Sequence, residues 1–200
     1  MESPDELFRV VSAAFPSSLQ SKIELLVNII PAAEHRPHES LDAVVGDERV
    51  AIPGDACTTL YLTATRQPPS KRQALMLRAF YTRHHDGHVR EQSVQGIVKV
   101  CEPWVAPFVV CLVGEYVVEI VQIIDTALTD LTVEGSRQQR IYGRFGASNP
   151  DLIERTASRV ASYWNEYYRA ESATLSDYLP RRLFKRLEQA GRLFLTSPAS

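Results

Sequence analysis

Helix-start signals constrain the fold of this chain more than any other feature of its sequence. Each signal is followed by apolar residues at the spacing of one helix face. Most have the pattern Ser-x-x-Glu/Gln, in which the Ser oxygen accepts from the third backbone N–H and the Glu or Gln reaches back. Another places Pro at the first helical position. The signals lie at Ser3–Glu6, Ser17–Gln20, Ser70–Gln73, Ser136–Gln139 and Asn149–Asp151. Together they predict a mainly α fold.

The apolar periods after these signals define the expected helices. They cover residues 4–15, 17–30, 70–85, 88–100, 102–130, 136–146, 150–172 and 180–190. We therefore expect a single-domain array or bundle of about seven or eight antiparallel helices over residues 1–191. In it, residues 1–47 form an N-terminal helix pair and loop, and residues 70–191 form the main array. Gly191 is expected to end the last helix, which leaves 192–200 as a loose tail.

Residues 48–65 fit two structures. Arg49–Ile52 and Thr58–Thr65 resemble strands on either side of a turn at Pro53–Asp55, which predicts a small β-hairpin. A helix capped by Asp55 is the alternative. The preceding residues look like loop, with one helical turn around Leu41–Val45.

One segment resembles a known family. Asp86-Gly87, followed by Val89-Arg90 and an apolar Val94, is similar to the turn and second helix of a HEAT-type repeat. Glu102–Val105 could open another unit. The resemblance covers about residues 70–130 and implies antiparallel helix pairs whose surface binds other proteins.

Composition excludes several classes of protein. The chain has 200 residues, of which 44% are hydrophobic, and a formal net charge of −2, which argues against a chain built mainly to coat nucleic acid or an anionic membrane. The most apolar stretch, Trp104–Ile124, is interrupted by Glu115 and Glu119, so we expect no membrane span. The acidic N-terminus carries no targeting pattern. The three cysteines lack zinc or disulfide spacing, so we expect a cytoplasmic protein without a cofactor.

A histidine cluster is the most conspicuous polar motif. His84, His85 and His88 lie around Asp86-Gly87, and three imidazoles with a carboxylate suit a metal or a general base. On a helix, however, His84 and His85 would point about 100° apart. The alternative is a polar helix C-terminus, where His interacts well with the last carbonyls. We favour that alternative and expect no shared metal.

The acidic pair Glu115 and Glu119 has the i, i+4 spacing of one helix face. Two such carboxylates can act as acid and base or form half of a di-metal site. A structural role is simpler, because residues 101–135 hold six acids and no Lys or Arg, while 136–192 hold eleven basic and six acidic residues. We expect Glu115 or Glu119 to contact one of four arginines at matching helical spacing. These are Arg140, Arg144, Arg155 and Arg159.

The same basic region fits a second function. Its arginines could form a surface for nucleic acid, with nearby aromatic residues as stacking platforms. The platforms would be Tyr142, Phe145, Tyr163, Trp164, Tyr167 and Tyr168. The last helix, with Arg182 and Arg186, is basic and amphipathic, so it could touch a membrane or nucleic acid, or dock its Leu/Phe face on its own domain. We favour internal neutralisation and docking.

These patterns rank three functions. The first is a non-enzymatic helical scaffold that binds another protein or itself. The second is a DNA-binding regulator that uses residues 70–100 as a helix-turn-helix-like unit, and the third is a metal-dependent enzyme at the histidine cluster. The expected binding surface comprises His84, His85, His88, Arg90, Trp164, Tyr167, Arg182 and Arg186. No catalytic residue is assigned, since no nucleophile, base and oxyanion donor occur at recognisable spacing.

Overall fold

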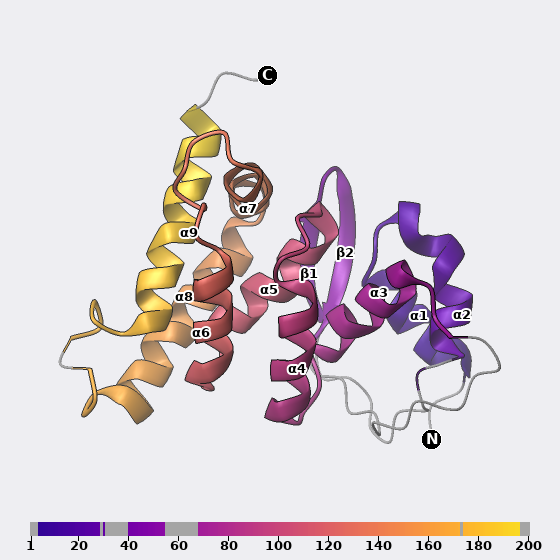
Figure 1. Ribbon diagram of the computed structural model, residues 1–200, viewed down its shortest axis with the longest axis horizontal. Coiled ribbons are helices and arrows are strands. Elements are labelled where there is room, and N and C mark those ends of the chain that lie inside the picture. The colour runs from indigo at the N-terminus through magenta and orange to yellow at the C-terminus, as the bar shows by residue number, and fades with distance from the viewer. Residues whose placement is uncertain (1–3, 29, 31–39, 55–67, 173, 197–200) are drawn as a thin grey trace. The chain divides into compact units, whose positions relative to one another are not determined.

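The protein is mainly helical with one small antiparallel hairpin, as the sequence predicts (Figure 1). The computed structural model describes all residues except 1–3, 29, 31–39, 55–67, 173 and 197–200. These described residues divide into two compact units, Met1–Ile97 and Val98–Ser200. None of the helices in these described parts is long and apolar enough to cross a membrane.

The first unit combines short helices with the hairpin. Its elements in chain order are α1 (Pro4–Ala13), η1 (Ser17–Lys22), α2 (Ile23–Val27), β1 (Ser40–Val45), β2 (Glu48–Pro53), α3 (Lys71–Tyr81) and α4 (Gly87–Ile97). The apolar faces of these elements supply the core, in which Val11, Ile23 and Met76 are fully buried. Burying such side chains is the main stabilising term for a unit of this size.

The hairpin differs in pairing from the expectation. Strand β2 covers the predicted strand 49–52, but its partner is Ser40–Val45, so the helical turn expected at Leu41–Val45 is wrong. Gly46 has φ +65° and Asp47 has no positive φ, which is the pattern of a type II′ turn. Ala43 and Val45 face the core, since alternate residues of a strand share a face. The expected second strand, Thr58–Thr65, lies outside the described residues.

The helix-start signals are confirmed in part. Ser70 is the N-cap of α3 and forms the full capping box: its Oγ accepts from the Gln73 N–H, and Gln73 accepts from the Ser70 N–H. Ser17 does not cap a helix. Its N–H and hydroxyl instead donate to Glu48 at 2.7 and 3.0 Å, because β2 brings a carboxylate to this turn.

The second unit is built around helix α5. Its elements are η2 (Pro103–Val105), α5 (Ala106–Val113), α6 (Val118–Ala127), α7 (Arg137–Ser148), α8 (Pro150–Tyr163), the π-helix η3 (Trp164–Tyr168) and α9 (Leu179–Thr196). Every residue of α5 is buried, because α7, α8 and α9 all contact it. Helix α8 begins at Pro150, as predicted.

The single helix expected over 102–130 is wrong. The chain leaves helical geometry between α5 and α6, where Val117 is extended (φ −82°, ψ 100°). Gly114 is the C-cap of α5 and lies close to α8: a Cβ there would be 3.3 Å from Thr156 Cγ2, so the glycine allows α8 to pack directly against this turn. The break also separates Glu115 from Glu119, which therefore do not share one helix face.

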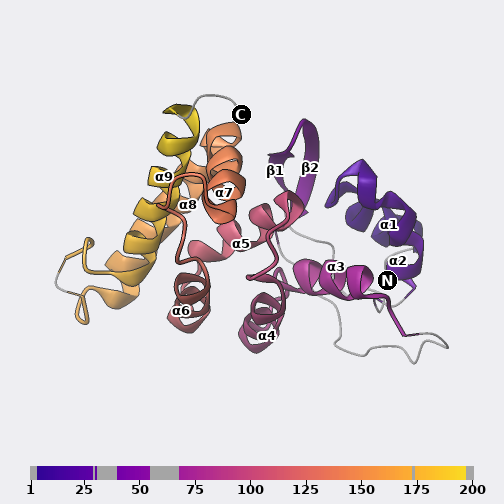
Figure 2. The same cartoon turned by 45° about the horizontal axis from the view of Figure 1, so that its top comes forward.

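Helices α7 and α9 pack side by side (Figure 2). Ser136 caps α7 by accepting from the Gln139 N–H. The expectation that Gly191 ends the last helix is wrong, since α9 continues to Thr196 and includes part of the expected tail. Gly191 is buried opposite Gly143 and serves close packing in place of helix termination.

Candidate functional site

Three tyrosines form a partly exposed row at one end of the second unit. Tyr163 lies between Tyr116 and Tyr167, with ring centroids 5.8 and 6.1 Å apart. Tyr116 is 49% exposed and Tyr167 is 62% exposed, which is unusual for large side chains of the described residues. Arg159 lies with its guanidinium carbon 5.9 Å from the centre of the Tyr163 ring. We call these four residues the tyrosine surface.

Two helical elements place the tyrosine surface. Arg159, Tyr163 and Tyr167 follow one another at i, i+4 spacing along α8 and the π-helix η3, so they lie on one face. Tyr116 comes from the break between α5 and α6. The sequence predicts one helix over 150–172, but α8 gives way to η3 at Trp164. Single π-turns of this kind occur frequently at functional sites.

Tyr168 fastens these two elements together. Its hydroxyl donates to the Tyr116 carbonyl at 2.6 Å, and its ring stacks on Tyr178 with centroids 5.1 Å apart. Burial raises the pKa of the Tyr168 hydroxyl, and the negative charges of Glu119 and Glu171 raise that pKa further. The hydroxyl therefore stays protonated and remains a donor at neutral pH.

Tyr178 packs against the ring of Tyr168. It is 2% exposed, and burial raises the pKa of its hydroxyl well above the ordinary value. This hydroxyl has no hydrogen-bond partner among the described residues. The buried Tyr178 ring thus provides an apolar surface on which the Tyr168 ring packs.

Changing Tyr168 to Phe tests this fastening. We expect the free energy of unfolding to fall by about 1 kcal/mol, because the Tyr116 carbonyl loses its donor. Tyr167→Phe removes an exposed hydroxyl from the same π-helix and is the matched control, with an expected change within about 0.5 kcal/mol. Chemical denaturation measures both. Equal effects of the two variants would contradict the role of Tyr168.

Glu115 orients the arginine of the tyrosine surface. Arg159 Nη2 lies 3.8 Å from Glu115 Oε1, which is one of the contacts that the charge pattern predicts. The Glu115 side chain is 7% exposed and that of Arg159 is 41% exposed, so a buried carboxylate holds a half-exposed guanidinium. Glu119 is exposed, and no ion pair to it occurs in the described parts of the chain.

Two of the other arginines expected to neutralise these acids do not pair with them. Arg140 and Arg155 are exposed, and neither forms an ion pair with Glu115 or Glu119 within the described residues. Arg186 instead pairs with Asp125 at 2.5 Å and donates to the Leu128 carbonyl, so it joins α9 to the end of α6. Charge neutralisation between the acidic and basic segments therefore occurs at particular ion pairs, such as Glu115–Arg159 and Asp125–Arg186.

The expected stacking platforms separate into two groups. Tyr142 and Phe145 are buried in the core and cannot meet a ligand. Trp164 is half-buried, and its indole N–H donates to the Ser172 carbonyl at 3.1 Å. The Arg169 guanidinium lies 5.8 Å from the centre of the Trp164 ring. Trp164 therefore supports the loop after η3, while Tyr167 remains accessible.

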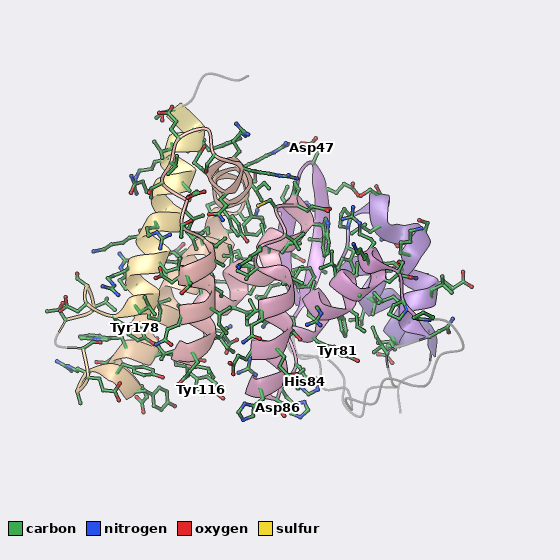
Figure 3. All side chains as sticks on the ribbon, in the orientation of Figure 1. Asp47, Tyr81, His84, Asp86, Tyr116 and Tyr178 are labelled. Carbon is green, nitrogen blue, oxygen red and sulfur yellow. The ribbon has the colours of Figure 1, made fainter. Side chains whose placement is uncertain are left out.

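The histidine cluster lies at the turn between α3 and α4 (Figure 3). Helix α3 ends at Tyr81, so the divergent directions expected for His84 and His85 are wrong; their rings stack with centroids 4.3 Å apart. His84 is buried and its Nδ1 accepts from the Asp86 N–H at 3.0 Å, whereas His85 and His88 are exposed. Among the described residues, no group of His, Cys, Asp and Glu could hold a metal ion.

Asp86 begins helix α4 at this turn. Its carboxylate accepts from the His88 N–H at 2.9 Å, and this hydrogen bond is the main cause of the lowered pKa of the Asp86 carboxyl. Asp86 thus caps the first turn of α4, and the histidines lie around this turn and not in the last turn of α3, where the sequence had placed them.

Arg90 was expected on a binding surface, but it is buried. Its Nη1 donates to the carbonyls of His84 and His85 at 2.9 Å each. Arg83 acts in the same way and donates to the carbonyls of Pro53 and Gly54. Both arginines satisfy backbone carbonyls inside the first unit, at the end of β2 and in the turn before α4, so Arg90 is not available to a groove of DNA.

A shallow groove of about 340 Å³ also lies between α1 and β2. Its lining comprises Glu6, Arg9, Val10, Ala13, Ser40, Ala51 and Pro53. This lining is largely aliphatic, and it contains no histidine or cysteine that could act as base or thiol nucleophile. Its polar side chains are Glu6, Arg9 and Ser40, whereas the tyrosine surface offers exposed aromatic rings, which are enriched at protein interfaces.

Comparisons with protein-family models, curated proteins and solved structures find no match to this chain. The candidate site consequently rests on its own geometry. Sequence reasoning had singled out Tyr167, but Tyr116 and Tyr178 were missed. The signal for Tyr116 was Gly114, a glycine directly before the charged and aromatic residues that interrupt an apolar run.

Proposed function

We propose that the protein is a non-enzymatic interaction protein that binds another protein through the tyrosine surface. The proposal is based on the row of three tyrosines, in which the side chains of Tyr116 and Tyr167 are about half exposed or more. Neighbouring residues fix the positions of these side chains. Tyrosine and arginine dominate the energetics of protein interfaces, because they offer a large contact area with few rotatable bonds. A cytoplasmic location is part of this proposal.

The contacts that fix Arg159 and Tyr116 favour a binding role for the tyrosine surface over a purely structural one. Arg159 is held by Glu115, and Tyr116 is held by Tyr168, so neither residue needs much ordering when a partner arrives. Pre-organisation of this kind increases affinity, since less conformational entropy is lost on binding. The HEAT-type resemblance points toward the same class of function but concerns a different part of the chain.

A double variant tests the proposal. The partner is first identified by cross-linking to purified protein, and its dissociation constant is then measured with Tyr116→Ala/Tyr167→Ala. We expect each truncation to weaken binding about tenfold, because exposed aromatic rings lose their buried contact area. Raising the salt concentration should change the affinity little, since apolar contact dominates this surface.

Two controls accompany this variant. Phe8→Ala truncates another exposed aromatic ring, which is 41% exposed and lies on α1, and it should leave the affinity unchanged. Tyr116→Phe/Tyr167→Phe keeps both rings and should bind nearly as well as the unmodified protein. Self-association that disappears in the alanine variant would identify a second copy as the partner. Equal affinities of the alanine variant and the unmodified protein would contradict the proposal.

A further inference from the structure

Charge is strongly segregated within the second unit. Helices α7 and α9 together hold eight basic residues and one acidic residue. The rest of residues 98–200 holds four basic and eleven acidic residues. Because α7 and α9 pack directly against each other, their cations lie on adjoining helices (Figure 2). The unit is close to neutral in total but carries its positive charge on one helix pair.

Ion pairing within the unit accounts for only part of this positive charge. Arg186 is paired with Asp125 and Arg181 with Glu188. Five further cations are exposed and form no ion pair within the described residues. They are Arg137, Arg140, Arg182, Lys185 and Arg192, and we call them the basic face. Like charges at i, i+3 spacing destabilise a helix slightly, so the folded chain gains nothing from these positions on its own.

The spacing of the basic face suits an extended anion. Arg182 and Lys185 are one turn apart on α9, and Arg192 follows about 10 Å further along the helix at 1.5 Å per residue. All but one of the five cations are arginines, whose planar guanidinium binds two oxygens of a phosphate at once.

The packing of α9 argues against a membrane as the anionic partner. Its apolar side chains Leu183, Phe184 and Leu187 are at most 3% exposed, so the part of the helix that carries Arg182 and Lys185 has no free apolar face to insert into lipid. The exposed large apolar side chain on α9 is Leu195, and no exposed aromatic ring occurs on the described parts of α7 or α9. Without such rings, unstacked bases have no platform, which favours the backbone of a duplex over single strands.

We infer that the basic face binds the phosphate backbone of double-stranded nucleic acid without sequence preference. This second binding site uses residues other than the tyrosine surface, so it stands independently of the proposed partner protein. Its cations would bind phosphate groups and so position the protein on the duplex, without hydrogen bonds to base edges.

Salt dependence tests the inference quantitatively. Binding of a labelled DNA duplex is followed by fluorescence anisotropy at several salt concentrations. If about four cations contact phosphates, the plot of log affinity against log salt has a slope of about −3.6, and affinity falls about 100-fold between about 50 and about 200 mM. Arg182→Gln/Lys185→Gln should reduce the steepness of this slope by about 2.

A charge-matched control separates the basic face from net charge. Lys99→Gln/Arg155→Gln removes two exposed cations from the same unit, outside α7 and α9, and should leave the slope unchanged. Arg137→Gln/Arg140→Gln provides a second test on α7, in case the α9 variant folds poorly. Tyr116→Ala/Tyr167→Ala should bind the duplex normally, so failure of one proposal leaves the other intact.

Three results would overturn the inference. The first is no measurable binding to the duplex at about 50 mM salt. The second is an equal loss of affinity in the α9 variant and the charge-matched control. The third is binding to phosphatidylserine vesicles or to a polyglutamate peptide with equal or greater affinity than to the duplex, which would assign the basic face to a different anion.

Discussion

Replacing Gly143 with alanine is expected to lower the free energy of unfolding by about 3 kcal/mol. A Cβ at this position would lie 2.4 Å from the Ala190 carbonyl oxygen and 3.0 Å from Phe194 Cβ. The first of these atoms belongs to the backbone of α9, so relief requires α7 and α9 to move apart. Such a shift would also stretch the hydrogen bond from Gln139 Nε2 to the same carbonyl, now 3.2 Å long.

Gly191→Ala is the matched control, because it adds the same methyl group to the facing helix. The nearest atoms to a Cβ at Gly191 are 3.9 and 4.0 Å away, which is ordinary contact. We expect no loss of stability and a gain of up to about 1 kcal/mol from the higher helix propensity of alanine. Urea unfolding of both variants measures the difference. Similar midpoints for Gly143→Ala and Gly191→Ala would show that α7 and α9 are not in close contact.

Local signals predicted the helical class and several helix boundaries. The capping box at Ser70 and the proline at the start of α8 act over three or four residues, so the sequence contains all the information that they need. The strongly apolar run before Gly114 forms α5, in which every residue is buried. Short-range hydrogen bonds and apolar periodicity are properties that a single sequence displays directly.

Features that depend on distant packing could not be predicted in the same way. The break after Gly114 lies where α8, more than 35 residues later, packs against that glycine, and the local sequence does not reveal this contact. Gly191 looked like a helix end for the same reason: a glycine permits both termination and close approach, and only its contact with α7 decides between them. The hairpin partner is a different case, because Gly46-Asp47 is a local signal for a two-residue hairpin turn that the interpretation of Ser40–Val45 as loop and helical turn overlooked.

The candidate site shows the same division. Tyr163 and Tyr167 share a face at i, i+4 spacing, which the sequence reveals. Tyr116 joins them only through the break, and its position depends on a hydrogen bond from Tyr168. Arg90 illustrates the opposite error: its charge suggested a surface residue, yet it is buried in the first unit and donates to the carbonyls of His84 and His85 in the turn after α3.

Truncating Phe108 to alanine is expected to have the largest effect on stability, a loss of about 3–5 kcal/mol. Phe108 is fully buried in α5, where helices pack on every side, so the cavity left by the ring cannot be filled by solvent or by a mobile neighbour. Tyr167→Ala removes an aromatic ring of similar size from the same unit, but that ring is 62% exposed, and its loss should cost less than about 1 kcal/mol. Denaturant titrations that follow near-ultraviolet circular dichroism compare the two variants in the full chain. Comparable stabilities would mean that α5 does not form the core of the second unit, and the frame that holds the tyrosine surface would then have to be sought among α6, α8 and α9.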